Sequence, residues 1–182
     1  AKRKYLKITK KIELKENEKV ISIEPNKDGL KVDFQLVYNN QVIGTQSNQI
    51  NFTDSNLTDV YSSRTFCLYE DIEKIKAIGL AKGGSLENAV VVKGDEILNA
   101  EGLRNNKEFV NHKILDLAGD FLLSGYRILG SVKCDQGGHS LSNLFLRAIF
   151  KDESNFVIVE QEESTSIKNY FKIPTNKLAV NA

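Results

Sequence analysis

The sequence has no methionine, not even at position 1, and only two prolines, two cysteines and two histidines in 182 residues. Because translation starts at methionine, we expect a processed product or a piece of a longer protein. We find no signal-peptide pattern and no apolar run as long as a membrane span. The sequence therefore predicts a chain that does not cross a membrane.

The net charge and the cysteine content bear on two further questions, nucleic-acid binding and disulfide bonding. The net charge is only +1, so composition gives no reason to expect nucleic-acid binding. Cys67 and Cys134 are far apart and form no Cys-x-x-Cys pair. This use of cysteine is typical of free thiols in a reducing compartment, and one disulfide remains the alternative. Hydrophobic residues make up 41% and charged residues 27%, as in ordinary globular domains.

Several short stretches have the alternating or β-branched pattern of strands. We expect strands at residues 20–24, 30–38, 49–52, 64–67, 89–92, 128–134 and 156–159. A helical pattern at 70–78 predicts a strand-helix-strand insert over 69–92. Two longer helices are predicted at 106–124, ended by Gly125, and at 140–150. The order predicts an α+β fold: a small mixed sheet with two long helices packed on one face.

Residues 1–15 are rich in lysine, with apolar residues interleaved. This pattern favours a solvated edge strand, in which lysines block pairing with other sheets. Phosphate binding is the alternative, but it needs a basic cluster that this segment alone does not establish.

His112, Asp116 and Asp120 are each four residues apart within the predicted helix 106–124. On an α-helix this spacing places the three side chains on one stripe. The rest of the segment is largely apolar, which is typical of a buried helix, and buried charges need partners. Zinc binds His and Asp together. A histidine bonded to its own carboxylate, without metal, is the other interpretation, and spacing alone favours it.

Five blocks of sequence carry a family resemblance. They are RTF (64–66), LAKGGSLENA (80–89), LNAEGLR (98–104), EFVNHKILDLAGD (108–120) and GHSLSN (138–143). In order and spacing they resemble the C-terminal domain of UDP-3-O-acyl-N-acetylglucosamine deacetylases, the zinc amidases of bacterial lipid A synthesis. The similarity covers about residues 5–180 and favours the metal over the metal-free interpretation.

The resemblance implies a single domain over 1–182, which pairs with a similar N-terminal domain around a zinc ion. It implies that His112 and Asp116 are two zinc ligands, and that the third ligand comes from the N-terminal domain. It also implies that the insert 69–92 forms a passage for the acyl chain. The implied lining residues are Leu68, Ile72, Ala81, Gly84, Ser85, Ala89 and Val91.

Five further residues resemble the family's catalytic and substrate-contacting positions. His139 resembles the histidine that stabilises the oxyanion and protonates the leaving amine, and Asp120 the carboxylate that orients it. Thr65 resembles the hydroxyl that polarises the substrate carbonyl. Lys113 resembles a polar substrate contact, and Phe66 a residue beside the sugar. Histidine has a pKa suited to this proton transfer.

The activity implied by the resemblance is hydrolysis of the N-acetyl group of UDP-3-O-acyl-N-acetylglucosamine, in the bacterial cytoplasm. Two departures from the family stand out. The family's His-Glu-His stretch, which supplies a ligand and the general base, is absent, and Gln136 stands where a basic residue near the diphosphate is common. We therefore expect about half an active site, inactive alone. The rival interpretation is a non-catalytic binding module of the same fold.

Overall fold

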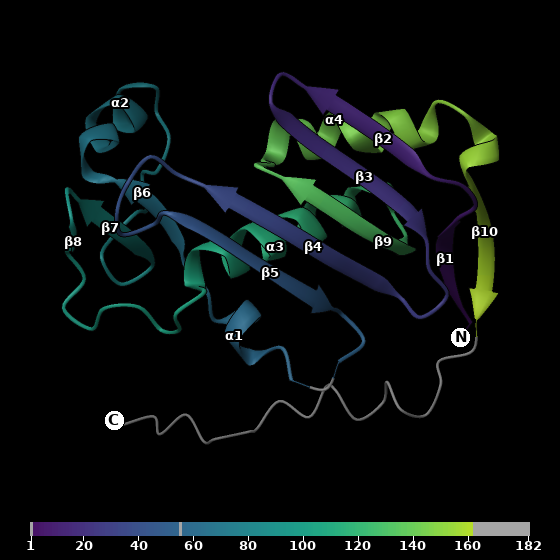
Figure 1. Ribbon diagram of the computed structural model, residues 1–182, viewed down its shortest axis with the longest axis horizontal. Helices are drawn as coiled ribbons and strands as arrows, with labels where there is room; N and C mark the ends of the chain where they lie inside the picture. The colour runs from purple at the N-terminus through teal and green to yellow at the C-terminus, as the bar shows by residue number, and fades with distance from the viewer. Residues whose placement is uncertain (1, 55, 162–182) are drawn as a thin grey trace, which may run out of the picture.

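The computed structural model describes residues 2–54 and 56–161 (Figure 1). In its main sheet, a single strand pairs with two separate groups of strands. This strand is β9 (Arg127–Asp135). Its residues 127–129 run parallel to β1 (Arg3–Ile8). Its residues 130–135 pair antiparallel with β3 (Lys19–Pro25) and parallel with β4 (Leu30–Val37). The sheet is therefore mixed, and the predicted α+β class is confirmed.

The outer strands of the sheet pair with these inner strands. They are β2 (Ile12–Glu16) on β3, β5 (Thr45–Asn51) on β4, and β10 (Phe156–Gln161) on β1. The prediction of an edge strand at residues 1–15 is therefore wrong for β1, which has a partner strand on each side. Leu6 and Ile8 are fully buried there, which lysine content alone did not reveal.

Alternation along β4 shows why these residues form a sheet with one buried face. Val32, Phe34 and Leu36 point into the core, and the residues between them face the other side. On β9, Gly130 allows close packing, because a Cβ there would lie 2.6 Å from Ile23 Cδ1.

Two helices cover the same face of this sheet, behind it in Figure 1. Helix α3 (Glu108–Phe121) continues as the 3-10 turn η2 (Leu122–Ser124) and ends at Gly125, whose φ of 78° is left-handed. Helix α4 (His139–Phe150) follows β9. The two helices meet where the rings of Phe121 and Phe145 stack with centroids 6.3 Å apart. Helices α3 and α4 carry His112 and His139, so the packing of these helices on the sheet fixes where the two histidines lie.

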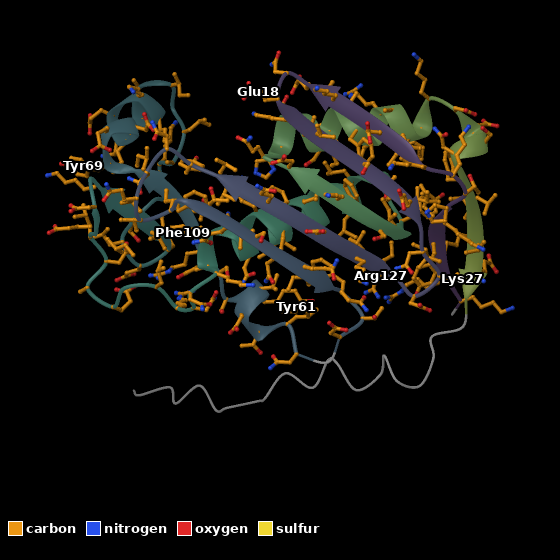
Figure 2. All side chains as sticks on the ribbon, in the orientation of Figure 1. Glu18, Lys27, Tyr61, Tyr69, Phe109 and Arg127 are labelled. Carbon is orange, nitrogen blue, oxygen red and sulfur yellow. The ribbon has the colours of Figure 1, made fainter. Side chains whose placement is uncertain are left out.

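A second, three-stranded sheet lies at one end of the large sheet, at the left of Figure 1. Its elements in chain order are β6 (Thr65–Leu68), η1 (Tyr69–Asp71), α2 (Ile72–Ala77), β7 (Ala89–Lys93) and β8 (Glu96–Ile97). Figure 2 labels Tyr69 on this side, and Lys27 and Arg127 at the opposite end of the large sheet. The insert thus projects from the end at which α3 begins.

Two short elements complete the described ranges, α1 (Thr58–Tyr61) and the 3-10 turn η3 (Glu153–Asn155). Helix α1 lies before β6 and packs against α3. No helix over residues 2–54 and 56–161 is both long and apolar enough to cross a membrane. The part of the predicted domain beyond residue 161 lies outside the described residues.

Candidate active site

Helix α3 carries a stripe of four ionisable side chains, each one turn from the next. The stripe contains Glu108, His112, Asp116 and Asp120, since residues four apart share a helix face. The sequence indicated roles for the last three residues and none for Glu108. The same spacing of four was the signal that could have found it.

His112 and Asp116 face each other across one helical turn. His112 Nε2 lies 3.3 Å from Asp116 Oδ1. His112 Nδ1 lies 3.3 Å from the carbonyl oxygen of Ser63, which can only accept a hydrogen bond. That contact favours a proton on Nδ1 and leaves the Nε2 lone pair toward Asp116. Burial lowers the pKa of His112 in spite of the Asp116 charge, so the ring tends to be neutral.

The distance between these two groups fits zinc. Bonds of about 2.0–2.2 Å at tetrahedral angles put two ligands of one zinc ion about 3.3–3.5 Å apart. The observed separation of Nε2 and Oδ1 is 3.3 Å. A neutral imidazole and a carboxylate are also the forms that bind metal. Over the described ranges, no group of three or more His, Cys, Asp or Glu side chains could hold a metal ion. His112 and Asp116 therefore fit two positions of a site that needs more.

His139 is the first residue of α4, so this helix begins one residue before its predicted start at residue 140. The reason is that the backbone of Gly138 is extended, and the helix begins directly after it. His139 Nδ1 lies 2.9 Å from Asp120 Oδ2, so the ring N–H donates to the carboxylate. His139 Nε2 lies 3.9 Å from Asp116 Oδ2, and 66% of the side chain is exposed. One ring nitrogen is thus anchored and the other is open to a ligand.

A shallow depression, too narrow to admit a water molecule, lies between α3 and the start of α4. Its lining residues are Phe34, Lys113, Asp116, Leu117, Asp120, Gly137, Gly138 and Ser142. Lys113 Nζ lies 3.3 Å from Asp116 Oδ2. Gly137 has no room for a side chain, because a Cβ there would overlap Cys134 Sγ. Lys113 thus lies beside the carboxylate that faces both histidines.

Strand β6 carries Thr65 and brings the Phe66 ring to the stripe on α3. The Phe66 ring lies edge-on to His112, with centroids 6.4 Å apart, and to Phe109, with centroids 5.0 Å apart. Figure 2 labels Phe109 where α3 meets the insert. Thr65 is exposed and lies two residues after Ser63, whose carbonyl contacts His112. The structure thus brings Phe66 to the stripe and places Thr65 beside it in the chain.

The residues expected to line an acyl passage fall into three classes of exposure. Ala89 and Val91 are buried in β7, and Leu68 and Ile72 are half-buried. Ala81, Gly84 and Ser85 are exposed in the segment between α2 and β7. All belong to the insert or adjoin it, and their contact with an acyl chain stays a prediction.

Glu108 forms a buried ion pair that the sequence analysis missed. Its carboxylate, 0% exposed, accepts hydrogen bonds from Arg64 Nε at 2.8 Å and Arg64 Nη2 at 3.2 Å. It also accepts from the backbone N–H groups of Arg64 at 3.0 Å and Arg104 at 2.7 Å. Burial raises the pKa of Glu108, but the hydrogen bonds and charge of Arg64 outweigh burial and lower it overall. The pair ties β6 and the 99–105 loop to the start of α3.

Both cysteines are free thiols, as the first of the two sequence interpretations has it. Cys134 is buried beside Gly137, and burial raises the pKa of its thiol to about 12. Cys67 on β6 is half-buried, and burial raises its pKa as well. Neither thiol is therefore ionised at neutral pH, which argues against a nucleophilic role for them.

Known proteins match the chain over most of its length. The family model described as UDP-3-O-acyl N-acetylglycosamine deacetylase matches residues 1–151. The curated UDP-3-O-acyl-N-acetylglucosamine deacetylases of Campylobacter jejuni subsp. jejuni serotype O:2, a Psychrobacter species and Aliarcobacter butzleri are 38%, 37% and 34% identical to it. These alignments cover 95%, 95% and 97% of the chain. The chain spans only 58–59% of the length of these relatives.

Proposed function

Because the chain belongs to the UDP-3-O-acyl N-acetylglycosamine deacetylase family, we propose that it supplies about half of a zinc-dependent deacetylase active site. The proposed substrate is UDP-3-O-acyl-N-acetylglucosamine, which loses its N-acetyl group as acetate in lipid A synthesis. The observation that carries the proposal is the convergence of His112 Nε2, Asp116 and His139 Nε2 beside α3. The bacterial cytoplasm, implied by the resemblance, is its proposed location.

His112 and Asp116 would hold the zinc ion, and a third ligand would come from a partner N-terminal domain. The His-Glu-His stretch that would supply this ligand and the general base is absent from the chain. When bound, zinc lowers the pKa of a water molecule and polarises a carbonyl. In this proposal the Ser63 carbonyl orients His112, because it accepts the Nδ1 proton and leaves Nε2 unprotonated.

His139 would handle the proton that the leaving amine needs. Its Nδ1–H donates to Asp120, which fixes the direction of the ring. The exposed Nε2–H would donate first to the developing oxyanion of the acetyl carbonyl. It would then protonate the nitrogen as the amide C–N bond breaks and the water oxygen stays on the carbonyl carbon. General acid catalysis of this kind contributes about 10²–10⁴-fold to the rate.

The remaining predicted residues would position the substrate. Lys113, 3.3 Å from Asp116, would place a positive charge beside the position where the acetyl group reacts. The Thr65 hydroxyl would polarise the acetyl carbonyl, and the Phe66 ring would pack beside the sugar. The exposed apolar residues of the insert, among them Ile78, Leu80 and Leu86, are consistent with a surface that receives an acyl chain.

The rival function is a binding module of the same fold that performs no chemistry. Acetate release separates the two functions, measured for full-length protein that joins this chain to a His-Glu-His domain. We expect turnover by the joined protein and its loss in the His112→Ala variant. The 182-residue chain alone should lack activity, since it has neither the third ligand nor the general base. A joined protein that binds the substrate but releases no acetate would favour the binding module.

A further inference from the structure

One peptide group connects the buried ion pair to the candidate zinc ligand. The carbonyl oxygen of Ser63 lies 3.3 Å from His112 Nδ1. The N–H of the same peptide group, that of Arg64, donates to Glu108 Oε1 at 3.0 Å. Glu108 and His112 are one helical turn apart, so this peptide lies across both side chains. A carboxylate, a peptide group and an imidazole thus form one chain of hydrogen bonds.

The Arg64 side chain holds the carboxylate end of this chain in place. Its guanidinium grips Glu108 with two hydrogen bonds, donates to the Gly102 carbonyl at 2.7 Å and pairs with Glu101. Arg64 and Glu108 are both buried. Buried bidentate pairs fix geometry as well as charge. Glu108 therefore has one available position, with Oε1 directed at the Ser63–Arg64 peptide.

The geometry points to Glu108 as a positioning residue for His112, an inference that rests on the proposed function. A hydrogen bond from the peptide N–H to a carboxylate polarises the peptide, which makes its carbonyl a stronger acceptor. The Ser63 carbonyl then holds the proton on Nδ1 of His112. It also sets the plane of the ring, so the unprotonated Nε2 faces Asp116. Such outer hydrogen bonds orient metal-binding histidines in general.

A second contact of the His112 ring competes with the Ser63 carbonyl for the position of the ring proton. Asp116 Oδ1, 3.3 Å from Nε2, is itself an acceptor and favours a proton on Nε2. A histidine protonated there offers no lone pair to zinc. The polarised carbonyl of Ser63 opposes that protonation from the other side of the ring. Loss of the Glu108 charge should therefore weaken zinc binding without removing a ligand.

The test measures zinc affinity by chelator competition in the full-length enzyme. The variant is Glu108→Gln with Arg64→Met, which removes both buried charges together and leaves no unpaired ion in the core. We expect its zinc affinity to fall about 10–100-fold, as for other substitutions of the residues behind a metal ligand. The matched control is Glu101→Gln, which removes the other carboxylate from Arg64 but does not touch the peptide. Its zinc affinity should change less than about threefold, because exposed pairs contribute little.

Wild-type zinc affinity in the double variant, with the enzyme folded and active, would overturn the inference and leave the proposed function intact. A wild-type enzyme that binds no zinc would overturn both. If the double variant does not fold, Arg64→Lys decides. It keeps the Glu108 charge and both backbone N–H donors that hold this carboxylate on the Ser63–Arg64 peptide, so zinc affinity should stay within about threefold even where the melting temperature falls. Affinity that falls in step with stability would show a purely structural role.

Discussion

The two ends of the stripe on α3 have the same spacing and nearly the same chemistry, but opposite surroundings. At the first end, Glu108 is sealed from water and accepts four hydrogen bonds from Arg64 and Arg104. At the other end, Asp120 bonds one histidine, and 66% of that histidine's side chain is exposed. His112 and Asp116 lie between the two ends.

This difference in exposure separates side chains that stabilise the fold from side chains that can exchange protons. A buried carboxylate with every lone pair engaged cannot exchange protons with a substrate, and its charge stabilises the fold only while Arg64 remains. An exposed histidine anchored through one nitrogen can exchange a proton through the other. We therefore expect substitutions at the sealed end to reduce stability, and substitutions at the open end to reduce catalysis. The following predictions test that division.

The largest expected effect is on the rate, at the open end. His139→Gln in the full-length enzyme should lower kcat about 10²–10⁴-fold, because the proposed general acid is lost. The melting temperature should stay near that of the wild type, since the His139 side chain is mostly exposed. Ser140→Ala, the exposed neighbour on α4, is the matched control and should keep full activity. A His139→Gln variant that loses stability as well as rate would contradict the proposed difference between the two ends of the stripe.

At the sealed end, Glu108→Ala should lower the free energy of unfolding by about 3–5 kcal/mol, because it leaves Arg64 buried without its main partner. For a chain of this size that corresponds to a fall of about 6–20 °C in melting temperature. Thermal and urea unfolding measure both quantities. Glu101→Ala, at the 55% exposed partner of the same arginine, should have a much smaller effect. A Glu108→Ala protein as stable as the wild type would contradict the role given to this pair.

A smaller loss is expected beside the open end, at the turn before α4. Gly137→Ala should cost about 1–3 kcal/mol, since its Cβ would overlap Cys134 Sγ and force the backbone to shift. Gly138→Ala is the matched control, because no atom lies within 4 Å of a Cβ there. Its cost should be within about 0.5 kcal/mol. Similar losses in urea unfolding of the two variants would show that the packing under His139 is not tight.

Acid should weaken the sealed end through Glu108. Its folded-state pKa lies below the ordinary value of 4.5, so its stabilising effect is fully present above about pH 4.5. That effect is lost as the pH falls through the lower, folded-state pKa. The double variant Glu108→Gln with Arg64→Met should therefore lose less stability than the wild type on acidification below pH 4.5. Urea unfolding at several pH values makes the comparison, and parallel curves would count against the assignment.

Local patterns in the sequence were enough for the parts of the fold that depend on neighbours in the chain. The alternation at 30–38 gave β4, and the spacing of four gave the stripe on α3. The α+β class followed from the order of elements. These features depend on periodicity and need no long-range information.

Long-range pairings could not be read in the same way. Arg64 and Glu108 are 44 residues apart, and nothing local indicates that they meet in the core. The position of β1 between β9 and β10 depends on long-range strand pairing. The lysine-rich composition of residues 1–15 wrongly indicated an edge strand there. His139 meets Asp120 only because β9 returns the chain to α3, and its predicted role came from the family resemblance rather than from spacing.

The central claim is that this chain holds half of a zinc site. The most direct test is thermal unfolding of the 182-residue chain, with and without micromolar zinc. A ligand stabilises the folded state only in proportion to its affinity, and two protein ligands should bind zinc weakly. The two melting temperatures should therefore be nearly the same. A large rise with zinc would show that a complete site forms within this chain, and would contradict the assignment of the missing ligand to another domain.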